Sequence, residues 1–137
     1  MAERHFILEE ANALLPRLTP ILRQLIAVRH RMAEKHGKME ELRAHVRGNG
    51  ATAEGRLFAQ LKDELESIAA ELRQGIEEIQ GFGCVMKDLE VGLIDFPALR
   101  LGQEVYLCWK LGEERIAFWH GIEEGFAGRK PVGAEFA

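Results

Sequence analysis

Apolar residues recur every three or four positions over the first third of the chain. From about residue 9 to about residue 46 they follow a heptad seam, which is typical of a helix that packs along its length. The seam consists of Leu18, Ile21, Leu25, Val28, Met32, Lys35, Met39, Leu42 and Val46. Pro16 and Pro20 fall inside this stretch. Because a proline in a helix interior costs about 3 kcal/mol, we expect a kink or a restart there.

A second helix is expected between two glycine-rich breaks. The segment 47–52, RGNGAT, interrupts the first pattern and ends with Thr52, which is suited to cap the next helix. The following apolar stripe consists of Leu57, Leu61, Leu65, Ile68, Leu72, Ile76 and Ile79. GFG at residues 81–83 ends it at about residue 80. At 1.5 Å per residue the two helices would be about 55 and 45 Å long, too long for a small sheet to cover. We therefore expect them to pack on each other or on another subunit.

The charge of the two helical segments favours an antiparallel hairpin. Residues 23–47 carry seven basic and three acidic residues, whereas residues 52–80 carry three basic and seven acidic ones. Opposite charges attract, although an exposed pair contributes at most about 1 kcal/mol. As an alternative, the basic positions could form a nucleic-acid face; these are Arg23, Arg29, Arg31, Lys35, Lys38, Arg43 and Arg47. No aromatic residue interleaves with them to stack on bases, so this alternative is disfavoured.

After Gly83 the pattern changes to β-branched and aromatic residues with recurring glycines. We expect three antiparallel strands, over residues 91–99, 104–110 and 115–120, with Pro97 ending the first of them. The segment LRLG at 99–102 should turn the chain, and LGEE at 111–114 should form a type II′ hairpin turn. That hairpin would pair Trp109 with Ile116, Leu107 with Phe118 and Val105 with His120.

This register sorts the side chains onto two faces. One face would hold Val105, Leu107, Trp109, Ile116, Phe118 and His120, and the other Tyr106, Cys108, Ala117 and Trp119. The two tryptophans would then point to opposite faces. Both faces are largely apolar, so we expect the helices to cover one, and the C-terminal segment or a partner subunit the other. The expected fold is one α+β domain over residues 1–137: a helical hairpin at 1–82 and a small three-stranded antiparallel sheet at 83–137.

Four residues near the expected hairpin have the donor atoms of a divalent-metal site: Asp88, Asp95, Glu113 and His120. No pair of them has a diagnostic spacing. The simpler interpretation is a histidine that is hydrogen-bonded to one of these carboxylates and stabilises the edge of the sheet.

The segment GFAGRK at residues 125–130 could hold a small anion, because glycines expose backbone N–H groups and Arg129 offers a planar fork. A ligand site would then combine Asp88, Asp95, His120 and Arg129. In the structural alternative, Arg129 pairs with Asp88 or Asp95 and holds the C-terminal tail over the sheet. In either case we expect Asp95 within reach of Arg129 or His120, because an unpaired buried carboxylate is costly.

Cys108 would alternate away from His120, which disfavours a Cys–His nucleophile.

Composition and the N-terminal residues bear on the cellular location of the protein. The formal net charge is −4 and the two cysteines, Cys84 and Cys108, form no CxxC motif. The chain starts without the apolar core of a signal peptide and has no run of about 20 apolar residues that could cross a membrane. We therefore expect a cytoplasmic protein.

Several segments resemble the bacterial family catalogued as domain of unknown function 2203. They are LEEANALLP (8–16), KDLEVGLIDFP (87–97), LCWKLGEERIAFWH (107–120) and GFAGRKP (125–131). The resemblance implies a small soluble bacterial protein but supplies no activity. It also implies a threonine at position 7, which would form a capping box with Glu10, whereas this chain has Ile7.

Three functional hypotheses follow from the sequence. The first is a non-enzymatic structural or interaction protein that forms a homodimer, through a coiled-coil seam and an apolar sheet. The second is a metal- or anion-binding protein that could act as a hydrolase. The third is a weak nucleic-acid binder. Convergence of the candidate polar residues in one pocket would favour the second hypothesis, and their dispersal into surface ion pairs would favour the first.

Overall fold

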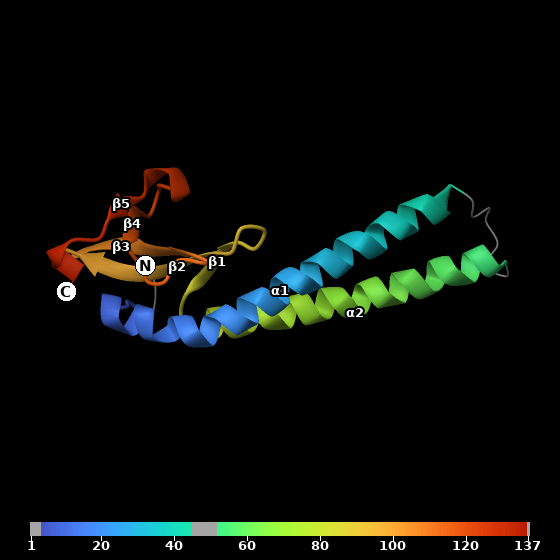
Figure 1. Cartoon of the computed structure of the whole chain (residues 1–137), viewed down its shortest axis with the longest axis horizontal. Coiled ribbons are helices and arrows are strands. Elements are labelled where there is room, and N and C mark those ends of the chain that lie inside the picture. Colours follow the sequence, from blue (N-terminus) through green and yellow to red (C-terminus); the bar gives the residue numbers. More distant parts are fainter. Residues whose placement is uncertain (1–3, 45–51, 137) are drawn as a thin grey trace.

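A computed structural model describes residues 4–44 and 52–136 of the chain. Two long helices, α1 (Leu8–Arg43) and α2 (Ala53–Gly81), form an antiparallel hairpin that extends beyond a small sheet (Figure 1). The predicted hairpin is confirmed, with ends close to the expected ones. Thr52 caps α2, since its side chain accepts the Gly55 N–H at 2.9 Å. The rest of the predicted break, residues 47–51, lies outside the described residues, as does Val46.

Helix α1 starts at Leu8 with half of a capping box. The Glu10 carboxylate accepts the Ile7 N–H at 3.0 Å. Ile7 has no side-chain oxygen with which to accept the reciprocal bond. The helix then continues through Pro16 and Pro20 without a restart, and Figure 1 shows its axis bending in the first third. Thr19 donates its hydroxyl to the Leu15 carbonyl at 2.8 Å, a contact that often accompanies a bend.

Ion pairs join the basic face of α1 to the acidic face of α2. Arg31 lies 3.3 Å from Glu71, and Lys35 lies 2.6 Å from Glu64. The Lys35 ammonium donates to Glu64 and holds the pKa of that carboxyl below its usual value. Arg31 and Lys35 therefore pair with α2, as expected for an antiparallel hairpin of two oppositely charged helices.

The sheet has five antiparallel strands in the order β1-β2-β3-β4-β5, not the predicted three. They are β1 (Val85–Asp88), β2 (Leu93–Arg100), β3 (Gln103–Lys110), β4 (Phe118–Gly121) and β5 (Lys130–Pro131). The two short edge strands were missed because four residues and two residues give too little alternation to recognise. Two short 3₁₀ helices, η1 (Phe126–Gly128) and η2 (Ala134–Phe136), flank β5.

Pro97 lies inside β2 and does not end it, contrary to the prediction. Strand β1 pairs with β2 only at residues 93–95, so β1 does not cover this edge of β2 beyond Asp95. The Pro97 carbonyl on that edge accepts the Phe6 N–H at 2.7 Å. Because N–H and C=O of one residue point to the same side of an antiparallel strand, the N–H that proline lacks would also face this edge and not β3.

The predicted register between β3 and β4 was wrong by one residue. Strand β3 pairs Tyr106 with His120 and Leu107 with Trp119, whereas the prediction paired Val105 with His120. The chain between the strands is not a two-residue turn, because β4 begins only at Phe118. Residues of this connection are held elsewhere: the Asn12 side chain accepts the Ile116 N–H at 2.7 Å.

The corrected register divides the sheet into a core face and an outer face. The core face packs on α1 and includes Ile94, Phe96, Leu107 and Trp109, all fully buried. Trp119 packs against the same core, so the two tryptophans do not point to opposite faces. The outer face is covered near β4 by the segment containing η1. In the described parts of the chain, neither helix is apolar enough along its length to cross a membrane.

Candidate metal centre on the outer face of the sheet

Three neighbouring strands bring one carboxylate, one thiol and one imidazole together. Strand pairing places Asp95 of β2 opposite Cys108 of β3, and His120 of β4 opposite the adjacent Tyr106. The carboxylate oxygen, Sγ and ring nitrogen of these residues all lie within 4.8 Å of one another, and all three residues are buried. They are the candidate site.

His120 is fixed at both ring nitrogens. Nδ1 lies 2.8 Å from the carbonyl oxygen of Gly121, and Nε2 lies 3.1 Å from each carboxylate oxygen of Asp95. Since a carbonyl can only accept, Nδ1 carries a hydrogen. His120 therefore directs Nε2 at Asp95. The expectation that Asp95 lies within reach of Arg129 or His120 is confirmed for His120.

Cys108 occupies an environment that opposes its ionisation in the absence of a cation. Burial, and then the negative charge of Asp95, raise the pKa of the thiol to about 11, although Arg129 acts in the other direction. A neutral thiol is a poor nucleophile, and the two ring nitrogens of His120 already face the Gly121 carbonyl and the Asp95 carboxylate. The site is therefore poorly suited to cysteine nucleophile chemistry.

The donor atoms border a small cavity of about 120 Å³. Its lining consists of Lys87, Leu93, Asp95, Cys108, His120, Glu124, Gly125 and Phe126. The Glu124 carboxylate accepts the Gly121 N–H at 2.8 Å and lies 2.6 Å from the Lys130 ammonium. These two contacts hold the connection after β4 beside the site. The cavity leaves room for a metal ion together with water.

The other predicted ligands do not reach this cluster. Asp88 is exposed and caps the β1–β2 connection, where its carboxylate accepts the Glu90 N–H at 2.9 Å. Glu113 lies in the connection between β3 and β4, where its carboxylate accepts the Lys110 N–H at 2.7 Å. Of the predicted metal set, only Asp95 and His120 come together.

Arg129 pairs with Glu113, and neither predicted partner, Asp88 or Asp95, is its ion-pair partner. Its two terminal nitrogens donate to the two Glu113 oxygens at 2.9 and 2.7 Å, and one of them also donates to the Cys108 carbonyl at 3.0 Å. The guanidinium lies between the rings of Phe118 and Phe126, 4.4 and 4.7 Å from their centres. The fork that could bind an anion is thus occupied by a carboxylate of the same chain. We call this arrangement the Arg129 clasp.

The clasp holds both ionisable groups in their charged forms. Burial would lower the pKa of Arg129, but the hydrogen bonds to Glu113 and the interactions with Cys108 together outweigh it and raise that pKa. For Glu113, burial would raise the pKa, whereas the Arg129 and Lys110 hydrogen bonds lower it below its usual value. The sequence analysis offered a structural role for Arg129, in which it holds the C-terminal tail over the sheet. The geometry fits that role, but the acid that pairs with Arg129 is Glu113.

Cys108 is the member of the cluster that the predicted register misplaced. A signal for its contact with Asp95 existed in the chain: a two-residue turn at Leu101 and Gly102 places Asp95 opposite Cys108. Both turn residues have positive φ, as such a hairpin turn requires. No comparable turn motif in the sequence predicts the position of His120. The connection before β4 is held by contacts with Asn12 of α1 and with the Arg129 clasp, which are distant in the sequence.

A carboxylate, a thiolate and an imidazole form a donor set suited to zinc and related divalent metals. Metal-binding histidines usually donate their other N–H to a carbonyl or carboxylate, as His120 does to Gly121. Three protein ligands beside a cavity would also leave a coordination position for water.

Comparison with known proteins identifies a family but no activity. No curated protein and no solved structure matches the chain. One family model matches residues 4–132, which include both helices and the three residues of the candidate site. The chain belongs to this family, which is described as an uncharacterized conserved protein, DUF2203.

Proposed function

We propose that this protein binds a divalent metal ion of the zinc class between Asp95, Cys108 and His120. The observation that carries the proposal is the convergence of three different donor atoms within 4.8 Å at a buried position. The site combines a buried carboxylate, a buried imidazole and a buried thiol. A bound cation would neutralise the carboxylate and the thiolate together.

The surrounding contacts fit a preorganised site. Nδ1 of His120 is held by the Gly121 carbonyl, so Nε2 already points toward the proposed metal position. One end of the β3 backbone is held by the bond from Arg129 to the Cys108 carbonyl. Metal binding displaces the thiol proton, which the buried site otherwise retains, since the pKa of Cys108 is about 11. A reducing compartment such as the expected cytoplasm would keep this thiol available.

The test is a cobalt titration of metal-free protein. Cobalt(II) substitutes for zinc and gives a strong near-ultraviolet absorption when a thiolate coordinates it. We expect one equivalent to bind to the parent protein with this absorption, and zinc to abolish it by displacement. The variants Cys108→Ser and Asp95→Asn should bind cobalt at least about 10-fold more weakly, and Cys108→Ser should lack the absorption.

Cys84→Ser provides the matched control. Cys84 is also buried, and burial also raises the pKa of its thiol to about 11, but it donates to the Ile79 carbonyl at 3.2 Å, away from the candidate site. Its replacement should leave the titration unchanged. Circular dichroism of each variant separates loss of binding from loss of folding. A parent protein that gives no thiolate absorption, or an absorption that survives in Cys108→Ser, would contradict the proposal.

A further inference from the structure

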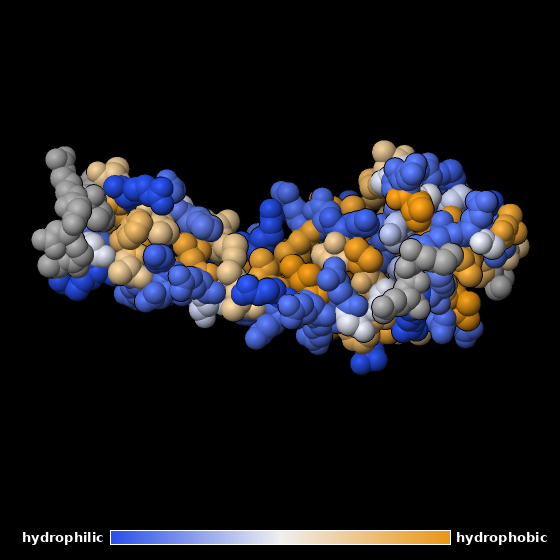
Figure 2. Space-filling model, turned by 180° about the vertical axis from the view of Figure 1, so that it is seen from behind, coloured by the Kyte–Doolittle hydropathy of each residue, from blue (hydrophilic) through white to orange (hydrophobic). Residues whose placement is uncertain are grey.

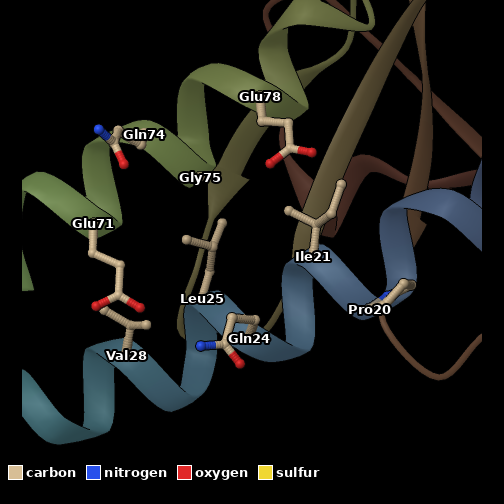
Figure 3. A pocket seen from close by; sticks show the side chains of 9 residues that line it. All are labelled: Pro20, Ile21, Gln24, Leu25, Val28, Glu71, Gln74, Gly75 and Glu78. Atoms are coloured by element: carbon tan, nitrogen blue, oxygen red, sulfur yellow. The ribbon is translucent and has the colours of Figure 1, made fainter.

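The hollows in the molecular surface differ in what they offer a ligand. Apolar surface follows the hairpin between hydrophilic bands on the face drawn in Figure 2. The groove between α1 and α2 is lined by Leu25 and Val28, which are already buried, and by Glu71 and Glu78 (Figure 3). The cavity beside the candidate metal centre is different, because Lys87 lines it together with the three metal-binding donors. A cation next to a metal position needs an explanation, since like charges repel.

Lys87 lies at an irregularity in strand β1. Met86 pairs with Ile94 and Asp88 pairs with Leu93, so Lys87 lies between two paired residues and has no partner of its own in β2. This is the pattern of a β-bulge, and bulges change the direction in which a side chain points. The irregular backbone and the lining of the cavity therefore coincide at Lys87.

The Lys87 ammonium is held on the outer face of the sheet, near His120. It lies 5.1 Å from the centre of the Tyr106 ring, within the range of a cation–π contact. Tyr106 is the strand partner of His120, and the centres of their rings are 5.6 Å apart. Lys87 is exposed and forms no ion pair in the described part of the chain. It therefore offers a positive charge at the edge of the cavity.

The carboxylates around Lys87 have other partners. Glu124, which also lines the cavity, has its carboxylate 2.6 Å from the Lys130 ammonium. Asp88, the next residue in the chain, directs its carboxylate to two backbone N–H groups of the connection between β1 and β2. Asp95 also lines the cavity, and it belongs to the candidate metal centre.

Metal binding would leave the charge of Lys87 unbalanced. The two positive charges of a divalent ion are offset by the Asp95 carboxylate and the Cys108 thiolate, since a histidine ligand is neutral. Three protein ligands also leave one position of a four-coordinate metal open. The metal-binding donors and Lys87 border the same cavity, whose volume of about 120 Å³ is that of about four water molecules.

We propose that the metal-loaded site binds a small monoanion, of the class of acetate and other short carboxylates, between the open metal position and the Lys87 ammonium. This inference rests on the proposed metal centre. One carboxylate oxygen binds the metal, and the other pairs with the lysine, a compact cation on a flexible stem. The anion site expected from the sequence used Arg129, whose fork is occupied by Glu113. Lys87 provides the cation that such a site requires.

The test is an acetate titration of the cobalt-loaded protein at constant ionic strength. The visible absorption of cobalt reports the coordination of the metal. We expect acetate to change this absorption with a saturable dependence on a single site. Acetamide has the same shape without the charge and should have a much smaller effect. An equal effect of both compounds would mean that the charge is not recognised, and would contradict the proposal.

Substitution of Lys87 separates the anion from the metal. Lys87→Gln should raise the acetate dissociation constant about 5-fold, the contribution of one exposed ion pair. Its cobalt affinity should stay unchanged or rise, because the substitution removes a cation beside the metal. Lys87→Arg keeps the charge and should keep most of the acetate affinity.

Lys62→Gln is the matched control. Lys62 lies on α2, is exposed and forms no ion pair in the described part of the chain. Its replacement removes the same charge away from the cavity, so the affinities for cobalt and for acetate should both stay unchanged.

The possible outcomes distinguish this inference from the metal proposal. A parent protein without the thiolate absorption of bound cobalt would overturn both. A cobalt-loaded protein that has this absorption but does not respond to acetate would overturn the anion site alone. So would a Lys87→Gln variant that binds acetate as tightly as the parent protein. A Lys87→Gln variant with weakened cobalt binding would assign Lys87 to the metal centre itself, and would also contradict the anion site.

Discussion

At the scale of single residues, the Arg129 clasp makes the most specific stability prediction. Arg129→Ala removes a two-point hydrogen bond to Glu113 and one bond to the Cys108 carbonyl. We expect it to lower the free energy of unfolding by about 2–3 kcal/mol, as loss of charged hydrogen bonds at a partly buried position does. Combined with Glu113→Gln, the loss should be smaller than the sum of the two single losses. Urea denaturation of the four proteins measures this, and strict additivity would contradict a direct pair.

The same pair predicts a pH dependence. The pKa of Glu113 is lower in the folded protein than its usual value of 4.5. A carboxyl group whose pKa is lower in the folded than in the unfolded protein stabilises the fold at pH values above its unfolded-state pKa. This stabilisation is lost as the pH falls through its folded-state pKa. The stability difference between the parent protein and Glu113→Gln should therefore be full at pH 7 and shrink below about pH 4.5. Urea curves at several pH values test it; a difference that stays constant down to pH 3 would exclude an ionised Glu113 as the cause.

Residue contacts were the least predictable feature of the sequence. Asp95 and His120 were recognised as candidates because isolated polar residues in apolar strands need partners. Cys108 was excluded because a shift of one residue moves a side chain to the opposite face of a sheet. The apparent LGEE turn concealed this shift: Glu113 accepts the Lys110 N–H and binds Arg129, and the connection continues to Phe118. These contacts cross the fold and leave no periodic trace in the sequence.

At the scale of elements, the two helices were predictable because their apolar periodicity extends over many turns, whereas the short edge strands were not. The close approach of the helices depends on Gly75, which periodicity did not identify. A Cβ there would meet Leu25, whereas a Cβ at Gly37 would meet nothing within 4 Å. Replacing Gly37 therefore changes helix propensity alone, whereas replacing Gly75 changes both helix propensity and the packing against Leu25.

We expect Gly37→Ala to stabilise the protein by about 0.5–1 kcal/mol, because alanine favours the helix over glycine. Gly75→Ala gains the same propensity but crowds Leu25, and overpacking of this kind costs about 1–3 kcal/mol. Gly75→Ala should thus be less stable than Gly37→Ala by about that overpacking cost. Chemical denaturation of both variants measures the difference, and equal stabilities would show that the helices can separate without loss.

At the scale of the whole molecule, the candidate metal centre and the helical hairpin occupy different parts of the fold. The outer face of the sheet holds the candidate metal centre, and the helical hairpin extends away from it (Figure 1). The sequence predicted an excess of helix length over sheet because length follows directly from residue count. It predicted a partner for Asp95, but not the approach of Cys108 or the pairing of Arg129 with Glu113, since these depend on strand register and on the connection before β4.

X-ray absorption of the zinc-loaded protein reports the atoms bound to the metal, and therefore tests directly whether Asp95, Cys108 and His120 bind it. We expect one sulfur at about 2.3 Å together with nitrogen and oxygen neighbours at about 2.0–2.2 Å. The sulfur contribution should disappear in Cys108→Ser and persist in Cys84→Ser. A spectrum of the parent protein with nitrogen and oxygen neighbours alone, or a sulfur contribution that depends on Cys84, would contradict a metal centre formed by Asp95, Cys108 and His120.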